Sequence, residues 1–186
     1  MLEILYNLDL AILHFFNITL ANPALDLFTI AYTQYLFPII LILAPLLVLI
    51  FDKKNGKTIF VMIISVYILA LIVSFSSEHL VFRTRPYLAL DTVRFLVTDS
   101  GFSCPSNHAM FSFVLATILS KKYGHSLIFY LLAVVMALSR VYMGLHYPSD
   151  ILLGAIIGII LSLIALNNED RINDLLNKIK SFRQSN

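Results

Sequence analysis

Long apolar stretches separated by short polar turns dominate the chain. They lie at 27–51, 58–82, 105–120, 126–143 and 149–166. All but 105–120 fall within the roughly 17 to 25 residues that a helix needs to cross a bilayer. The short one is expected to begin below the membrane surface. We therefore predict an all-α integral membrane protein, a helical bundle of five to six transmembrane helices, with its transmembrane core at 27–166.

The two ends of the chain differ from this core. Residues 8–21 form a shorter apolar run that Asn22 and Pro23 end, so residues 1–22 are interpreted as an interfacial or partly inserted helix, with a sixth span as the alternative. Apolar residues recur at helical spacing in 167–186, which predicts a cytoplasmic amphipathic tail on the membrane surface. A frayed, disordered end is the alternative. Residues 1–186 are thus treated as a single domain.

Composition supports the membrane class and excludes others. Apolar residues make up 59% of the chain and charged residues 13%, whereas soluble domains carry about a quarter charged residues. A net charge of +2 without a basic tract argues against nucleic acid as a partner. Cys104 is the only cysteine, so neither an internal disulfide nor a cysteine-based metal site can form. Gly154 and Gly158, four apart in an apolar run, predict close helix packing.

The lysines predict the orientation in the membrane. All seven fall in the turns at 52–57 and 121–124 and in the tail, which alternation places on one side. By the positive-inside rule that side is cytoplasmic, which predicts a multi-pass protein of the cell inner (cytoplasmic) membrane. The extracytoplasmic side receives the long loop 83–107, with three arginines and His108 directly after it, and the turn 140–149, with Arg140 and His146. Cations on the side expected to lack them indicate an anion-binding site.

Three clusters on that side carry residue types suited to phosphoryl transfer. They are 82–86 (FRTRP), 104–109 (CPSNHA) and 139–150 (SRVYMGLHYPSD). Arg85 and Arg140 offer planar cationic forks that match phosphate oxygens. Ser106 and Asn107 begin a helix after Pro105, where free N–H groups favour an anion.

The histidines complete the predicted chemistry. His146 and Asp150 lie four apart, a spacing that lets the carboxylate hold one imidazole nitrogen and aim the other at phosphorus. His108 is then available to protonate the leaving oxygen. Each residue also has a structural explanation, because membrane histidines are often only packed and arginines at helix ends often snorkel to lipid headgroups. Several together on one membrane face favour a functional site.

These three clusters resemble the type 2 phosphatidic acid phosphatase family, whose site is shared by vanadium haloperoxidases. The family pattern has Lys, six residues and Arg-Pro; then Pro-Ser-x-His; then Ser-Arg, five residues, His, three residues and Asp. The second and third parts are intact here, and the resemblance covers about 58–165. It implies that His146 is the nucleophile that forms a phosphohistidine, Asp150 its orienting partner and His108 the general acid. It also implies that Arg85, Ser106, Asn107 and Arg140 hold phosphate, with no metal or other cofactor.

One position departs from the family pattern. Glu78 stands where the family has its first lysine, a reversed charge. Arg83, two residues before Arg85, is a candidate for the missing phosphate-binding cation. Alternatively, Glu78 turns away, or pairs with Arg83 to bind another part of the substrate.

The resulting hypothesis is a hydrolase that removes phosphate from a lipid phosphate or diphosphate. Undecaprenyl diphosphate is favoured as substrate, with lipid A or phosphatidylglycerophosphate as alternatives. A non-catalytic carrier that only holds lipid headgroups is the alternative of another class, and an oriented imidazole argues against it. A haloperoxidase is disfavoured because those proteins are soluble. The sequence leaves the oligomeric state open.

Overall fold

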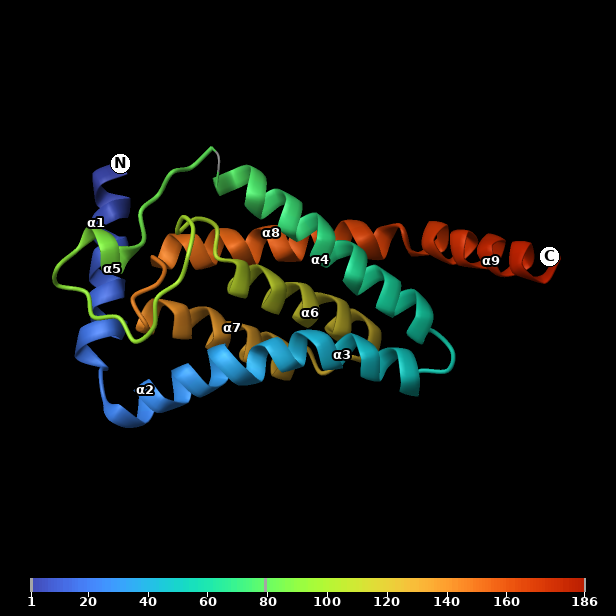
Figure 1. Ribbon diagram of the computed structural model, residues 1–186, viewed down its shortest axis with the longest axis horizontal. Helices are drawn as coiled ribbons and strands as arrows, with labels where there is room; N and C mark the ends of the chain where they lie inside the picture. The colour runs from blue at the N-terminus through green and yellow to red at the C-terminus, as the bar shows by residue number, and fades with distance from the viewer. Residues whose placement is uncertain (1, 79, 186) are drawn as a thin grey trace.

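The computed structural model describes residues 2–78 and 80–185, which form helices joined by short turns and one long loop (Figure 1). The first half contains α1 (Leu2–His14), the π-helical turn η1 (Phe15–Thr19), α2 (Pro23–Ile30), the π-helical segment η2 (Ala31–Leu36), α3 (Phe37–Phe51) and α4 (Gly56–Glu78). The second half contains α5 (Pro86–Ala89), α6 (Asn107–Tyr123), α7 (Ser126–Tyr142), α8 (Pro148–Asn167) and α9 (Glu169–Ser185). No strand occurs in these described ranges, and the predicted all-α fold is confirmed.

Three of the predicted spans are long and apolar enough to cross a membrane. They are Pro23–Phe51, Gly56–Ser77 and Pro148–Asn167, and Ser126–Tyr142 is a shorter apolar helix. The second span ends at Glu78, before the predicted end at Phe82. Beyond this end, two carboxylates outside α4 bind Arg83 and draw the chain away from the helix axis. The chain therefore leaves the helix early and reaches the site as extended backbone.

Helix α6 forms the centre of the bundle and packs against α4, α7 and α8. Its contact with α8 is close because two glycines face it. A Cβ atom at Gly154 would lie 2.5 Å from the carbonyl oxygen of Ser106, and one at Gly158 would lie 2.4 Å from that of Met110. Neither position has room for a side chain, so the predicted role of these glycines in close packing is confirmed. The same contact fixes the start of α6 against the start of α8.

The two ends of the bundle differ in content (Figure 1). At one end α1 crosses the long axis of the bundle, beside α5 and the long loop that leads to α6. At the other end lie the α3–α4 and α6–α7 turns and α9, which carry all seven lysines. The separation of lysines from the arginine-rich loop thus exists in space as well as in sequence.

The C-terminal tail is helical over Glu169–Ser185 and extends beyond the bundle roughly in line with α8 (Figure 1). Its first half is anchored to the bundle. Thr58 donates a hydrogen bond of 2.5 Å to the side-chain oxygen of Asn173, and Lys122 forms an ion pair with Glu169. The structure therefore favours the helical interpretation of the tail over the frayed one. The placement of this helix, and of α1, at a membrane surface stays a prediction.

Candidate active site

A polar cavity of about 200 Å³ opens at the end of the bundle where the long loop lies. Its lining brings together the three sequence clusters and the loop, with Arg85, Asp99, Ser100, Gly101, Phe102, Pro105, Asn107, His108 and His146. Arg140 lies beside it and contacts Asp99. Of the predicted site residues, Arg85, Asn107, His108 and His146 therefore line one cavity, to which Arg140 is joined through Asp99.

His146 lies in the turn between α7 and α8 and is held by both ring nitrogens. Its Nδ1 is 2.6 Å from the backbone carbonyl oxygen of Ser103, and its Nε2 is 3.1 Å from Nη1 of Arg85. A carbonyl can only accept and a guanidinium can only donate. The proton must therefore be on Nδ1, and the lone pair on Nε2 faces the cavity.

The surroundings keep this imidazole neutral. Burial, followed by the positive charges of Arg140 and Arg85, holds the pKa of His146 well below its usual range. A neutral ring with its lone pair on Nε2 is the form that can attack phosphorus. The same two arginines therefore favour both an anion in the cavity and an unprotonated His146.

Asp150 does not contact His146, which corrects the expected carboxylate–imidazole bond. Its carboxylate accepts from the backbone N–H of Tyr147 at 2.9 Å, from Oγ of Ser103 at 2.5 Å and from Nη1 of Arg83 at 2.5 Å. The physical reason is the local backbone. Asp150 is the third residue of α8 and turns back onto the start of the helix, whereas His146 precedes the extended N-cap residue Tyr147. The geometry that brings residues four apart together within a helix does not apply across this boundary.

Ser103 links His146 to Asp150 instead. Its carbonyl oxygen accepts from His146, its hydroxyl donates to Asp150, and its N–H donates to the carbonyl oxygen of Arg83 at 2.8 Å. Ser103 is fully buried. The carboxylate therefore positions the imidazole through one intervening residue. The sequence carried no signal for this serine, because it lies outside the three motifs.

Arg140 presents donors that have no partner in the chain. Its side chain is 1% exposed, and Nε and Nη1 are buried without a hydrogen bond, while Nη2 donates to Asp99 at 2.5 Å. Buried donors are almost always paired, and an unpaired one is costly. These two N–H groups are therefore placed for a ligand with acceptor oxygens.

Arg85 is partly committed to the loop. Its Nε and Nη2 donate to the carbonyl oxygens of Gly101 and Ser100, at 3.2 and 2.7 Å. Its Nη1 donates to the carbonyl oxygen of Leu145 at 3.2 Å and faces His146. Arg85 thus holds the loop over the cavity, and its Nη1 is shared between the carbonyl oxygen of Leu145 and the ring of His146.

The start of α6 supplies further anion-binding groups. Ser106 is the N-cap residue, its hydroxyl is buried without a partner, and the side-chain oxygen of Asn107 is also unpartnered. The first N–H groups of a helix favour an anion. His108 follows on this first turn, and its ring stacks on that of Phe37 in α3, with 5.5 Å between centroids. The start of α6 therefore faces the same cavity as His146.

Arg83 is not placed as a phosphate ligand, which corrects the expectation that it replaces the family lysine. It forms ion pairs with Asp150 at 2.5 Å and with Asp9 of α1 at 2.7 Å, and it stacks over the ring of Tyr147. Burial opposes its charge, but Asp150 and Asp9 together raise the pKa of Arg83. Two carboxylates compensate its charge before any substrate arrives. Only the backbone of Glu78 is described, so the question of where its side chain points lies outside the described residues.

Asp9 connects α1 to the site in a way the sequence did not predict. It accepts from the backbone N–H of Ser149 at 2.8 Å and from the hydroxyl of the same residue. A carboxylate at the start of α8 is favourable for the helix dipole. The N-terminal helix is therefore part of the shell around Asp150.

Two other polar residues near the site have structural roles. Arg94 pairs with Asp26 through two contacts of 2.8 and 3.0 Å and donates to the carbonyl oxygen of Asn17, so it fastens the loop to the N-terminal helices. Cys104 is buried, and burial first, then the charge of Asp150, raises the pKa of its thiol to about 11. The thiol is protonated at neutral pH and is a packed residue, as expected.

Comparison with known proteins identifies relatives of this arrangement. Residues 57–173 match the PAP2 superfamily. The chain is 31% identical over 174 residues to the lipid A 4'-phosphatase of Bacteroides thetaiotaomicron, an alignment that covers 85% of this chain and 75% of that protein. It is 37% identical over 93 residues to Escherichia coli YbjG, which is provisionally named an undecaprenyl-diphosphatase. That alignment covers 49% of this chain and 47% of the relative.

A solved structure agrees with the sequence relatives. The crystal structure of Aquifex aeolicus LpxE superposes with a TM-score of 0.73 at 30% identity, covering 86% of this chain and 95% of that chain. The three sequence clusters lie within the matched segment 57–173, whereas Asp9 and Phe37 lie outside it.

Proposed function

We propose that this chain, which belongs to the PAP2 superfamily and is a multi-pass membrane lipid phosphatase, transfers a phosphoryl group from its substrate to His146. The observation that carries the proposal is the orientation of this imidazole. Nδ1 is fixed by the carbonyl oxygen of Ser103, so Nε2 is free to attack. A residue that only held a lipid headgroup would not need a fixed tautomer, which argues against a non-catalytic carrier.

Substrate binding frees the nucleophile. In the structure Nη1 of Arg85 donates toward Nε2 of His146. A phosphate oxygen is a stronger acceptor because it is charged, so it draws Nη1 away and leaves the lone pair exposed. The unpaired donors of Arg140 and the start of α6 take the remaining oxygens. These contacts stabilise the charge that develops on the phosphoryl oxygens.

The reaction then proceeds in two displacements. The charge of the bound phosphate offsets that of Arg140 and Arg85, so His108 takes up a proton from water as the substrate binds. Nε2 of His146 then bonds to phosphorus while the bond from phosphorus to the lipid oxygen breaks, and His108 donates its proton to that oxygen. His108, now unprotonated, accepts a proton from water as the water oxygen bonds to phosphorus. The phosphorus–nitrogen bond breaks, and inorganic phosphate leaves. Asp150 acts as a positioning residue through Ser103.

Undecaprenyl diphosphate is the first candidate substrate. The sequence match to the E. coli protein supports it, and the polar cavity is compact. Lipid A is the second candidate, supported by the longer alignment with the Bacteroides enzyme. Phosphatidylglycerophosphate remains the third. These three lipids differ in the number of their hydrocarbon chains. The place where the protein binds the chains would therefore help to distinguish between the candidate substrates.

The site is proposed to face the extracytoplasmic side of the inner membrane. The lysines lie at the end of the bundle opposite the cavity (Figure 1), and the positive-inside rule makes their side cytoplasmic. The enzyme then acts on lipid phosphates exposed on the outer leaflet.

Phosphate release by purified protein tests this function. With EDTA present, we expect hydrolysis of at least one of the three lipids, and a loss of at least roughly 10³-fold in His146→Ala. His125→Asn is the control, because His125 lies at the opposite end of the bundle and Asn tolerates its left-handed backbone. Abolition of activity by EDTA, or equal activity in the His146 variant, would refute the histidine mechanism.

A further inference from the structure

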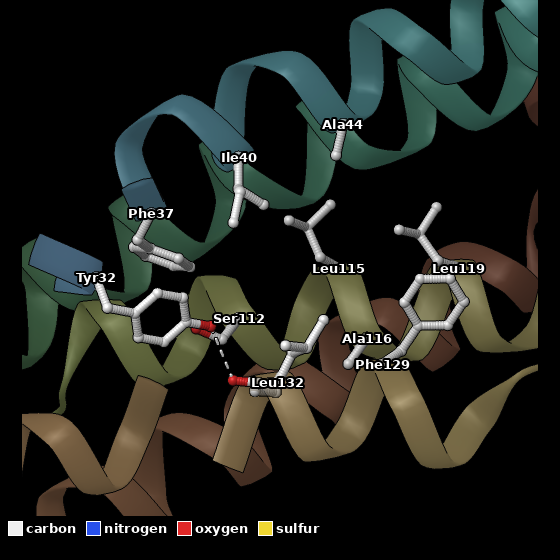
Figure 2. A pocket seen from close by; sticks show the side chains of 11 residues that line it. Tyr32, Phe37, Ile40, Ala44, Ser112, Leu115, Ala116, Leu119, Phe129 and Leu132 are labelled. Atoms are coloured by element: carbon white, nitrogen blue, oxygen red, sulfur yellow. Dashed lines mark hydrogen bonds between the residues drawn. The ribbon is translucent and has the colours of Figure 1, made fainter. Parts of the chain in front are cut away.

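An apolar groove of about 150 Å³ runs between α3 and α7 with α6 as its floor (Figure 2). One wall is the η2–α3 rod and the other is α7. The lining residues are Tyr32, Phe37, Ile40, Ala44, Ser112, Leu115, Ala116, Leu119, Phe129, Leu132 and Ala133. In Figure 2 the side chains of Phe37, Ile40 and Ala44 lie along one face of α3 and project toward α6.

The groove begins at the active site. Phe37 lines the groove and stacks on His108, which lines the polar cavity of the candidate active site, called the phosphate cavity below. From there the groove follows α3 for seven residues to Ala44, or about 10 Å at the rise of an α-helix. It runs toward the end of the bundle that carries the lysines (Figure 1). The groove and the phosphate cavity are therefore neighbours that meet at the Phe37–His108 ring pair.

The walls offer nothing to a polar ligand. The hydroxyl of Tyr32 donates to the carbonyl oxygen of Leu132 at 3.2 Å, and that of Ser112 donates to the carbonyl oxygen of His108 at 2.6 Å. Both hydroxyls on the lining are therefore satisfied within the chain. What remains for an occupant is apolar surface, which suits hydrocarbon.

We propose that this groove binds one hydrocarbon tail of the substrate, next to the phosphoryl group held by His146 and Arg140. The proposal rests on the proposed function. The volume of the groove, about 150 Å³, equals that of an apolar cavity that takes a single benzene. The groove therefore accepts a segment of one hydrocarbon chain and leaves any further chains in the bilayer. A lipid phosphate with one tail, such as a polyprenyl diphosphate, would place the start of its only hydrocarbon chain in this groove.

A second apolar groove provides the alternative path. It lies between α3 and α4, has a volume of about 370 Å³ and is lined on α3 by Leu41, Ile42, Pro45 and Leu46. Like the α3–α7 groove, it shares no lining residue with the phosphate cavity, but the α3–α7 groove is joined to that cavity by the stack of Phe37 on His108. We therefore assign the tail to the α3–α7 groove.

Chain-length selectivity tests the assignment. The probes are alkyl phosphates of four and sixteen carbons, because only the longer one reaches Ala44. In Ala44→Phe we expect the ratio of kcat/KM for the long chain to that for the short chain to fall at least tenfold. Ile42→Phe is the matched control, since Ile42 lies two residues away on α3 and faces the other groove. Its ratio should equal that of the wild type.

A second variant opens the groove instead of filling it. Phe129→Ala removes a ring from its far end (Figure 2), and we expect the ratio to shift at least threefold toward the longer chain. Unchanged ratios in both groove variants, or a fall in Ile42→Phe alone, would overturn the assignment. If the wild type released phosphate from neither probe nor from any of the three lipids, the proposed function itself would fail, and the groove assignment with it.

Discussion

The carboxylate of Asp99 lies 2.5 Å from Nη2 of Arg140 and 3.5 Å from Nη1 of Arg85. Phosphate oxygens require the same donors, so the substrate competes with an anion that the chain itself supplies. The backbone of Asp99 is fixed, because its carbonyl oxygen accepts from the hydroxyl of Tyr87 at 3.0 Å. Its side chain is 31% exposed. Rotation of the side chain alone therefore clears the site.

Removal of this internal anion should tighten phosphate binding. In Asp99→Asn we expect the inhibition constant for inorganic phosphate or vanadate to fall roughly three- to tenfold. This fall corresponds to a gain of up to about 1.4 kcal/mol in binding free energy. The effect is modest because the carboxylate is partly solvated. Asp91→Asn removes an exposed acid from the same loop and serves as the control. Weaker inhibition in Asp99→Asn would show that Asp99 instead holds Arg140 in its binding position.

Ser103 should control the rate more than the binding. Ser103→Ala keeps the carbonyl that holds His146 but removes the hydroxyl that donates to Asp150. A hydrogen bond to a charged group is worth about 1.5–3 kcal/mol, so we expect kcat to fall roughly tenfold to a hundredfold with KM nearly unchanged. Steady-state kinetics beside Ser126→Ala, an exposed serine at the opposite end of the bundle, provide the check. An effect on KM alone would contradict a positioning role.

Arg83 and Arg140 should behave differently toward phosphate. Arg83→Gln leaves the buried carboxylate of Asp150 without its cation, so we expect lower kcat and a loss of about 1–3 kcal/mol in stability. The inhibition constant for vanadate should change less than twofold. In Arg140→Gln the same constant should rise at least tenfold, because buried donors for phosphate are lost. Equal weakening of vanadate inhibition in both variants would make Arg83 a phosphate ligand after all.

The pH dependence follows from the state of His146. Because burial and the charges of Arg140 and Arg85 lower its pKa, the ring stays neutral as the pH falls through 6.5, the ordinary value for histidine. The acid limb of kcat/KM, which reports the free enzyme, should therefore lie below pH 6.5. In Arg140→Gln one of the charges that lowers the pKa is gone, so the limb should move to higher pH.

A charge at the far end of the bundle gives the control for this shift. Arg171 is exposed on α9, and Arg171→Gln should leave the acid limb in place. A limb at or above pH 6.5 in the wild type, or a downward shift in Arg140→Gln, would contradict the charge argument.

The apolar pattern was sufficient to predict the helical bundle, its central spans and the close glycine contact. The end of α4 was predicted four residues too late, because hydropathy continues through Val81 and Phe82 while the backbone turns away. Periodicity records which residues are apolar. It does not predict that Arg83 forms ion pairs with carboxylates of α1 and α8.

The motifs likewise identified the residues of the site but not all of their contacts. The spacing of His146 and Asp150 predicted a direct bond, and the helix boundary between them prevents it. Ser103, Asp9 and Asp99 could not be found from the sequence, because they meet the motifs only after the loop and α1 fold over the end of the bundle.

Rapid-quench labelling of the protein tests the central claim most directly. The purified enzyme would be mixed with lipid substrate carrying ³²P in the transferred phosphoryl group, quenched within one turnover and mapped. We predict label on His146 that is stable in alkali and lost in acid, present in His125→Asn and absent in His146→Asn. Label that persists in His146→Asn, or an active enzyme that never becomes labelled, would contradict the phosphohistidine mechanism.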